Sequence, residues 1–415
     1  MMVRSPLWIR RLASPGAEAF AGLYTLDSFC RALVATTIPL EALALLQTPH
    51  KVSLLYFLAC LCGLAATFTV PWFIRRTARR WVFSAGGILL ILAPLLIAGG
   101  GVAGLGAGMA LRVAGVVVVT VCVNLYILDF VDRRDFVRSE PKRMFYAAGA
   151  WTLGPLLGVL LRNEVATWAP YALACAGAFA LLGYFWFLRL TDSPAIQPAA
   201  GPPPSMLANL RRFVAQPRLN LAWLNIVGRC AFWGSFFVYA PIYAVTSGLG
   251  ELAGGLLVSA GTACAFLSPL GGAAIRRHGL RRTMVWAGIL AAAACFGVAA
   301  ATGWAWLGAG LLLAAAFAVS MMDASGNSLF LLAVRPRERA PMTAVYSTYR
   351  DAGELLPQGI FSVLLRAFEL PAVFVATGLG LLAFAGLSRR IHPRLGRVPQ
   401  QPAALQSGLE PAPRA

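Results

Sequence analysis

Long apolar runs, separated by short polar or basic segments, dominate the pattern of this chain. A transmembrane helix needs about 20 mainly apolar residues, and the sequence offers twelve stretches of that kind. Six precede a proline-rich break, near 19–46, 53–73, 82–101, 104–130, 144–161 and 170–190. Six follow it, near 220–246, 252–275, 284–303, 306–334, 342–366 and 371–388. The pattern predicts an all-α membrane protein with twelve transmembrane helices in two six-helix bundles.

The break divides the chain into four predicted units. They are a first bundle (1–190), a linker (191–219), a second bundle (220–390) and a tail (391–415) that we expect to be disordered. The linker begins with "SPAIQPAAGPPPS", which cannot continue a helix because proline lacks the backbone N–H. "SMLANLRRFVAQ" follows, with Ser205 at the N-cap position and one apolar face formed by Met206, Leu207, Leu210, Phe213 and Val214. This segment predicts a short helix, either on the membrane surface or in an ordinary soluble linker.

Composition and charge agree with a membrane protein. Hydrophobic residues make up 59% of the chain and charged residues 12%, about half the charged share of soluble proteins. The net charge is +19. If the N-terminus is cytoplasmic, the cytoplasmic segments hold 28 Lys and Arg residues, against only Lys51, Arg162 and Arg366 on the other side. By the positive-inside rule both termini are cytoplasmic, and the excess charge faces the anionic inner leaflet rather than nucleic acid. Abundant Arg, Ala, Gly and Pro suggest a GC-rich bacterial genome, and we expect the protein in the bacterial inner membrane.

The two halves repeat. "IRRTARR" at 74–80 and "IRRHGLRR" at 275–282 each lie between the second and third spans of a half. The matching pairs, at offsets of 201 to 203 residues, are Ile74 and Ile275, Pro39 and Pro241, Asn124 and Asn327, and Pro155 and Pro357. Four matches at nearly constant spacing indicate a duplicated six-helix unit, the architecture of transporters whose halves rock around a central site.

With these basic loops and this duplication, the chain resembles the major facilitator superfamily over its whole length. That family carries the loop motif Gly-x-x-x-Asp-Arg-x-Gly-Arg-Arg between helices 2 and 3 and between helices 8 and 9. The second copy, "GAAIRRHGLRR", matches at Gly272, Arg277, Gly279, Arg281 and Arg282. The first copy keeps Arg76, Arg79 and Arg80, with Ala78 in place of the glycine. The resemblance implies that both loops belong to the cytoplasmic gate.

Both loops depart from the family at one position, where Arg75 and Arg276 stand in place of the aspartate. In the family this aspartate helps to latch the cytoplasmic side. We therefore expect another acid near the end of helix 4 to take its place, with Asp129, Asp132 and Asp135 as candidates.

Two further family motifs match in part. In "RVAGV", Arg112 occupies the arginine position of the helix-4 motif Arg-x-x-Gln-Gly, which the family ties to proton transfer. In "LGPLLGV", Gly154, Pro155 and Gly158 match a helix-5 motif shared by exporters and antiporters. This match favours export. The alternative is a Gly/Pro kink that lets helices pack closely.

Charged residues inside the spans are the candidates for chemistry, because each costs about 2.5–3.5 kcal/mol to insert. Asp27 and Arg31 in helix 1 are four residues apart and share a helix face. They form either a proton or ion site or a self-neutralising pair. Arg229 in helix 7 falls at the repeat position of Asp27. We expect it to lie opposite Asp27 across a cavity, in substrate binding or gating, or else in a static salt bridge.

Helices 10 and 11 add a second group. Asp323 and Asn327 share a face of helix 10, while Tyr346, Arg350 and Glu354 form one stripe of helix 11 and Asp351 is offset from it. Arg350 and Asp351 could instead form an interfacial cluster. The predicted cavity residues are Asp27, Arg31, Arg112, Arg229, Asp323, Asn327, Tyr346, Arg350 and Glu354. Asp27, Arg112 and Glu354 are the predicted proton-coupling residues.

The leading hypothesis is a proton-coupled secondary transporter of a small polar or ionic solute that works by alternating access. Its partners are the solute, protons and the bilayer, and we expect a monomer that needs no cofactor, metal or nucleic acid. We do not expect an enzyme, because no histidine lies within a span. We do not expect ATP-driven transport either, because no ATP-binding Gly-x-x-x-x-Gly-Lys-[Ser/Thr] motif occurs. The alternatives are a membrane-embedded enzyme and a non-transporting sensor or scaffold on a transporter fold.

Overall fold

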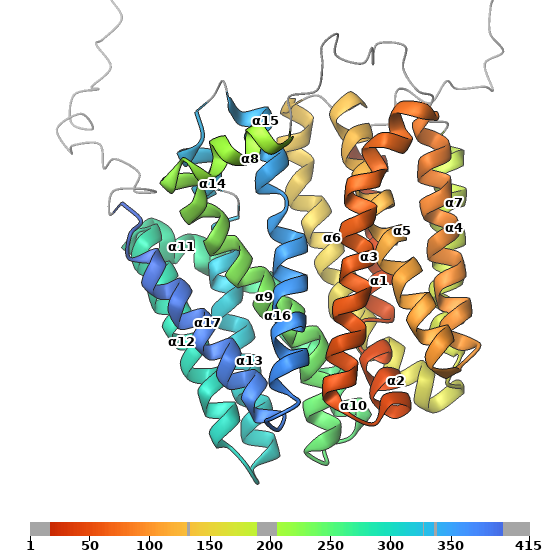
Figure 1. Ribbon diagram of the computed structural model, residues 1–415, viewed down its shortest axis with the longest axis vertical. Helices are drawn as coiled ribbons and strands as arrows, with labels where there is room; N and C mark the ends of the chain where they lie inside the picture. The colour runs from red at the N-terminus through yellow and green to blue at the C-terminus, as the bar shows by residue number, and fades with distance from the viewer. Residues whose placement is uncertain (1–16, 131–132, 189–205, 327, 336–337, 393–415) are drawn as a thin grey trace, which may run out of the picture.

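The computed structural model describes residues 17–130, 133–188, 206–326, 328–335 and 338–392. Its regular elements in these ranges are all helices (Figure 1). The first half contains α1 (Ala17–Leu33), α2 (Thr37–Leu46), α3 (Pro49–Arg76), α4 (Arg79–Ala98), α5 (Gly101–Phe130), α6 (Arg133–Leu160), the π-helix η1 (Leu161–Val165) and α7 (Ala169–Phe187). The second half contains α9 (Pro217–Thr246), α10 (Glu251–Ala263), the 3₁₀-helix η2 (Cys264–Leu267), α11 (Ser268–His278), α12 (Leu280–Ala300), α13 (Ala305–Asp323), α14 (Ser328–Ala333), α15 (Arg339–Tyr346), α16 (Tyr349–Leu364) and α17 (Pro371–Ser388).

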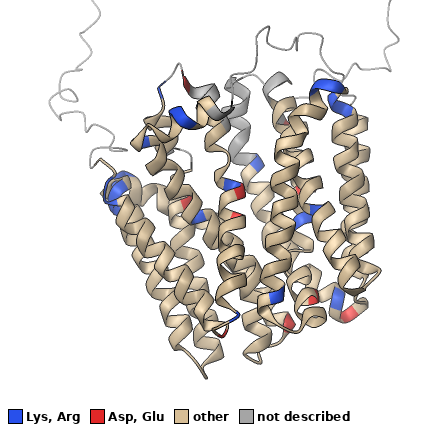
Figure 2. Ribbon diagram, in the orientation of Figure 1, with Lys and Arg blue, Asp and Glu red and all other residues tan. Residues whose placement is uncertain are grey.

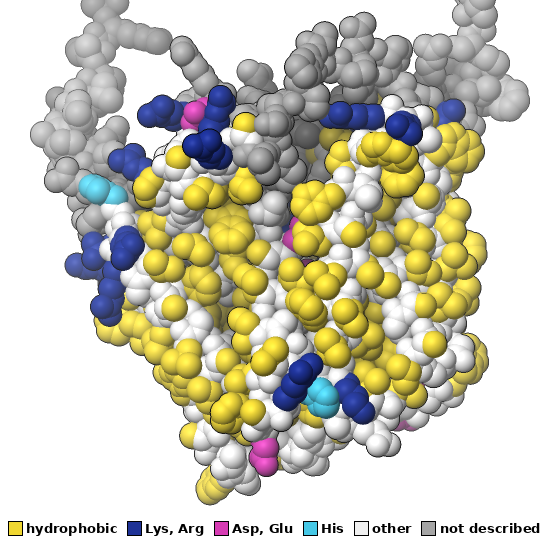
Figure 3. Space-filling model, viewed as in Figure 1, with side chains coloured by type: hydrophobic (Ala, Val, Ile, Leu, Met, Phe, Trp, Pro, Cys, Tyr) yellow, Lys and Arg dark blue, Asp and Glu magenta, His cyan; other side chains and the backbone are white. Residues whose placement is uncertain are grey.

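These helices form twelve spans, six in each half, as the apolar pattern predicts. Eleven of the described segments are long and apolar enough to cross a membrane. The remaining span joins α15 to α16, which has only 16 residues and carries Arg350, Asp351 and Glu354. The two-bundle, twelve-helix fold is confirmed. Figure 3 shows apolar side chains over most of the visible face, with arginines and lysines gathered mainly near its margins.

Several spans are divided into shorter helices, and the first span bends where the sequence weakens helix hydrogen bonding. Helix 1 is split between α1 and α2, just before Pro39, whose missing N–H cannot continue the ladder. There Ala35 N–H donates to the Ala32 carbonyl at 3.1 Å, a tighter turn than an α-helix makes.

Both basic loops fall between helices as predicted. "IRRTARR" joins α3 to α4, and "IRRHGLRR" joins α11 to α12. Gly279 has φ +87°, a conformation that an L side chain rarely adopts, whereas Ala78 at the matching position has φ −60°. This difference explains why the second loop needs the family glycine and the first does not. The end of the molecule that carries these loops is named the basic end, and the other the opposite end.

The linker helix α8 (Met206–Val214) lies at the basic end and contacts α15 and α9 (Figure 1). Its Phe213 is buried with Leu219, while Leu210 and Val214 are exposed. Asn220 Nδ2 donates to the Val214 carbonyl at 2.7 Å and so caps the end of α8. Ser205 lies outside the described residues, as does the tail from residue 393.

The two halves meet mainly along two helix pairs, α3 with α16 and α6 with α10, and α2 also contacts α9. The largest buried apolar cluster includes residues of both halves, such as Ile38 and Tyr171 from the first and Tyr239 and Leu257 from the second. Two smaller clusters each belong to one half. The shared core therefore holds the halves together.

The α6–α10 interface is built around Pro155. Because proline has no N–H, the Trp151 carbonyl four residues earlier lacks its usual helical donor. The Thr262 hydroxyl of α10 lies 2.8 Å from that carbonyl oxygen, the shortest of its three carbonyl contacts. In addition, the Leu156 N–H donates to Ser259 Oγ at 3.0 Å. The kink thus creates hydrogen bonds between the halves.

Two more polar groups cross between the halves. Ser53 and Tyr239 share a hydrogen bond between α3 and α9. Nearby, Arg162 Nη1 lies 2.5 Å from Glu41 Oε2, and Arg162 Nε lies 3.4 Å from Glu251 Oε2. Glu41 and Arg162 belong to the first half and Glu251 to the second. This charge triad ties the halves together at the opposite end.

Candidate transport site

Asp27 lies in the middle of α1 and is 4% exposed. Its Oδ2 pairs with Arg31 Nη1 at 3.4 Å, while its Oδ1 has no hydrogen-bond partner among the described residues. The i,i+4 pairing expected from the sequence is therefore present. It leaves half of a buried carboxylate unsatisfied, which a structural ion pair would avoid.

Arg112 of α5 extends this group. Its Nη2 donates to the Arg31 carbonyl at 3.3 Å, and the Arg31 guanidinium lies over the Trp151 ring at 5.8 Å from the centroid. That distance is within range of a cation–π interaction. Helices α1, α5 and α6 thus bring two arginines, a carboxylate and an indole together in the first half.

The second half faces this group with α16. Glu354 and Arg350 are exposed on α16, and Asp351 is partly exposed. Glu354 lies within electrostatic range of Arg112, and Arg350 within range of Asp27. Figure 2 shows charged residues inside the bundle at mid-height, well away from its ends. Each half therefore has an acid within electrostatic range of an arginine of the other half.

Arg229 does not complete this arrangement in the way that the repeat suggested. Its Nε pairs with Asp323 Oδ1 at 2.8 Å within the second half. Its Nη1 donates to the Met322 carbonyl at 3.0 Å, at the end of α13. Trp233 Nε1 donates to Asp323 Oδ2 at 2.9 Å. Arg229 therefore pairs with an acid of its own half, and a place opposite Asp27 stays a prediction.

The other predicted cavity residues are more scattered. Tyr346 is 3% exposed and stacks on Phe330, with ring centroids 4.1 Å apart, in an apolar cluster of the second half. Asn327 lies outside the described residues. The acids proposed to replace the missing latch, Asp129, Asp132 and Asp135, have side chains outside the described residues as well.

The loop arginines lie apart from this site. Arg75, Arg276 and Arg277 are exposed at helix ends. Arg79 is buried and lies over the Tyr126 ring at 5.1 Å, and Arg80 lies 5.9 Å from the Trp81 ring. The helix-5 residues Gly154 and Gly158 lie against α1, where an added Cβ at Gly158 would stand 2.0 Å from the Leu33 carbonyl oxygen. Close packing accounts for both glycines.

Three residues of the site were not predicted. Trp151 lies beneath Arg31. Tyr56 lies within electrostatic range of Arg112, and Cys230 within range of both Arg229 and Glu354. Apolar and aromatic residues are common in every span, so nothing in the linear pattern distinguishes these three.

Comparison with known protein families shows which family the chain belongs to. A family model described as the Major Facilitator Superfamily matches residues 20–357, most of the chain. The chain belongs to the major facilitator superfamily. Membership supports membrane transport, and not catalysis, as the activity of this fold.

Solved structures of superfamily transporters share this fold at low sequence identity. A POT family transporter in complex with a thioalcohol-conjugated peptide is 11% identical, with 89% of this chain and 94% of that chain covered at TM-score 0.68. The peptide transporter POT in complex with sulfate is 16% identical, with coverages of 92% and 95% at TM-score 0.69. The nucleoside transporter NupG is 14% identical, with coverages of 90% and 98% at TM-score 0.68. No curated protein sequence matches the chain.

Proposed function

We propose that this superfamily member is a proton-coupled secondary transporter of a small polar solute that carries an anionic group. The observation that carries the proposal is the charge arrangement between the halves: Glu354 lies within electrostatic range of Arg112, and Arg350 within range of Asp27. Such charges are costly within a membrane. They are retained where a solute or a change of state makes use of them.

The arginines supply the solute contacts. Arg31, Arg112 and Arg350 lie in this region, and the structure records an ion pair with a described residue only for Arg31. Guanidinium groups recognise carboxylate and phosphate through paired hydrogen bonds. Arg229 is assigned no such role, because Asp323 and the Met322 carbonyl occupy it. Arg31, Arg112 and Arg350 therefore suit a solute with one anionic group beside a hydrogen-bonding or cationic group.

The carboxylates supply the proton site. Rocking of the halves changes the distance from Asp27 to Arg350 and from Glu354 to Arg112. A buried carboxylate that loses its arginine is costly to keep charged and takes up a proton instead. Asp27 is suited to this role because one of its oxygens already lacks a partner. The shared core and the Arg162 triad favour the state closed at the opposite end.

The direction of transport stays a sequence-based prediction. The helix-5 match favours export, but packing against α1 accounts for Gly154 and Gly158. Measurements in both membrane orientations are therefore part of the test. In this proposal the basic end faces the cytoplasm from a bacterial inner membrane, since positively charged loops favour the cytoplasmic side.

The test uses purified protein in liposomes with a pH-sensitive dye inside. Amino acids, dipeptides and phosphorylated sugars are first screened by thermal shift, and a solute that stabilises the protein is then added with a proton gradient of either sign. We expect solute movement that follows the gradient and a matching change in internal pH. In Asp27→Asn the solute still binds, but its movement no longer depends on the gradient.

Glu18→Gln is the matched control, because it removes a carboxylate from the same helix at an exposed position. It should leave gradient-driven flux unchanged. Unchanged coupling in Asp27→Asn would remove Asp27 from the proposed mechanism. Stabilisation by the solute without any flux, in either orientation, would favour a sensor or scaffold over a transporter.

A further inference from the structure

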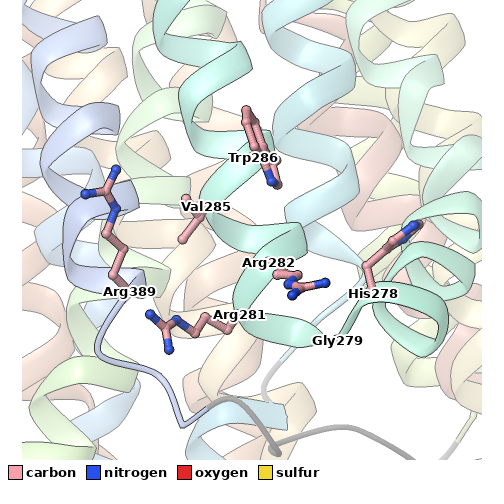
Figure 4. A pocket seen from close by; sticks show the side chains of 7 residues that line it. All are labelled: His278, Gly279, Arg281, Arg282, Val285, Trp286 and Arg389. Atoms are coloured by element: carbon pink, nitrogen blue, oxygen red, sulfur yellow. The ribbon is translucent and has the colours of Figure 1, made fainter.

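A separate pocket lies at the basic end of the second half, on the outside of the bundle. Its volume is about 460 Å³, and it lies where the α11–α12 loop meets the end of α17 (Figure 4). The residues that line it are His278, Gly279, Arg281, Arg282, Val285, Trp286 and Arg389. None of these belongs to the charged group between the halves, so the transport proposal does not account for the pocket.

The pocket is strongly basic. No carboxylate lines it, and among the described residues no ion pair is recorded for Arg281, Arg282 or Arg389. Figure 4 shows the Arg281 side chain extending from the first turn of α12 toward Arg389, and the Arg282 side chain extending toward His278. Three guanidinium groups around one pocket repel one another, and a bound anion would offset this repulsion.

The start of α12 adds to this preference. Gly279 is the N-cap and has no side chain with which to cap the first N–H groups of the helix. A helix N-terminus carries a partial positive charge and binds phosphate and similar anions. The helix end and the arginines therefore favour the same kind of ligand.

An apolar surface continues from the pocket along both helices. On α12, Arg282, Trp286 and Leu290 follow one another at intervals of four and form one stripe. On α17, Leu379, Leu382 and Arg389 share a face at intervals of three and seven. Trp286 is 69% exposed, and the three leucines are exposed as well. The two helices pack against each other.

The order of residues along these stripes matches a phospholipid. Each stripe begins with arginine at the basic end and continues with apolar side chains toward the middle of the span. Tryptophan lies between these parts on α12, at the level where aromatic residues gather at membrane interfaces. The positive-inside rule explains why arginines lie at this end, but it requires neither a pocket nor an apolar surface below each arginine.

We propose that this pocket binds the phosphate of an anionic phospholipid, with the acyl chains lying along the exposed faces of α12 and α17. Arg281, Arg282 and Arg389 contact the phosphate together with the N-terminus of α12. Trp286 covers the glycerol region, and Leu290 and Leu382 contact the chains. A basic pocket between helices at the membrane surface is suited to such headgroups.

Native mass spectrometry of the full-length protein in detergent tests the proposal. The probes are dioleoyl phosphatidylglycerol, dioleoyl phosphatidylcholine, glycerol 3-phosphate and inorganic phosphate. We expect one tight phosphatidylglycerol adduct and at least tenfold weaker binding of the other three. In Arg281→Gln/Arg389→Gln the affinity for phosphatidylglycerol should fall about thirtyfold, since each arginine near a membrane surface contributes roughly a fivefold factor.

Arg276→Gln/Arg277→Gln is the matched control. It removes the same charge from the same basic loop, but neither residue lines the pocket. Phosphatidylglycerol binding should change less than about threefold in this variant. Trp286→Ala should weaken phosphatidylglycerol binding while leaving the weak binding of inorganic phosphate unchanged. Folding of every variant is checked by its melting temperature without lipid, and Arg282→Gln replaces any double variant that fails this check.

Three results would overturn the proposal. Equal losses in the pocket and control variants would indicate a general charge effect. Equal binding of phosphatidylcholine and phosphatidylglycerol would show that the pocket does not select an anion. Binding of glycerol 3-phosphate or inorganic phosphate as tightly as the lipid would identify a site for a soluble phosphate, with no role for the apolar stripes.

Discussion

Arg229 pairs with Asp323 inside the second half, with 2.8 Å between Nε and Oδ1. Asp27, at the matching repeat position, pairs with Arg31 inside the first half. Each half therefore compensates its own central charge with a partner that moves with it. The electrostatic relations from Asp27 to Arg350 and from Arg112 to Glu354 cross between the halves. Rocking would preserve the first kind of contact and change the second, which separates structural pairs from candidate coupling residues.

Breaking the Arg229–Asp323 pair should show a structural role. Arg229→Met leaves the Asp323 carboxylate without its partner and should lower the free energy of unfolding by about 2 kcal/mol. Breaking a fully buried pair costs about 3–5 kcal/mol, and the smaller value is expected here because the Asp323 side chain is 32% exposed. Adding Asp323→Asn removes the charge and keeps an acceptor for Trp233, so the double variant should recover part of the loss. Thermal unfolding in detergent measures both. A double variant less stable than Arg229→Met would contradict this interpretation.

Substitutions of Pro155 and Thr262 should have stability effects that depend on each other, because both residues determine what bonds to the Trp151 carbonyl. Thr262→Val removes the hydroxyl 2.8 Å from that carbonyl and should cost about 1 kcal/mol, the usual net value of such a hydrogen bond. In a Pro155→Ala background the new N–H can bond to the Trp151 carbonyl within the helix. The cost of Thr262→Val should then be smaller. Melting temperatures of the four proteins form a double-mutant cycle, and purely additive effects would show that the kink and the hydroxyl act independently.

The charge triad should resist opening at the opposite end. Glu251→Gln removes the ion pair between Glu251 and Arg162, through which the triad joins the two halves, and leaves Arg162 paired with Glu41. Partly exposed ion pairs contribute about 0.2–1 kcal/mol, so amide hydrogen exchange in the first turns of α10 should become faster by up to about fivefold. Arg366→Gln, which removes an exposed charge predicted to lie on the same side, is the control. Equal exchange in the two variants would mean that the triad does not contribute to closure.

The sequence was sufficient for the fold and only partly for the site. Apolar run length gave the twelve spans, because length and hydropathy determine whether a segment can cross a bilayer. The i,i+4 rule gave the Asp27–Arg31 contact, because it acts within one helix. The pairing of Arg229 with Asp323 was not foreseen, because the repeat fixes depth along a helix but not the rotation of neighbouring helices. Asp323 of helix 10 could therefore reach Arg229 first. Trp151 was missed because an indole in an apolar span carries no distinguishing pattern.

Any side chain at Gly158 should destabilise the protein, because it would push α6 away from α1. A Cβ at this position would stand 2.0 Å from the Leu33 carbonyl oxygen, which is backbone and cannot turn aside. Gly158→Ala should therefore lower stability by about 1–3 kcal/mol, the usual cost of overpacking. Gly149→Ala on the same helix is the matched control, because nothing lies within 4 Å of its added Cβ. It should be neutral or stabilising by up to about 1 kcal/mol, since alanine favours a helix over glycine. Thermal unfolding compares the two. If Gly158→Ala were as stable as Gly149→Ala and yet lost transport, packing would not explain this glycine, and the helix-5 motif would regain its value as a sign of export.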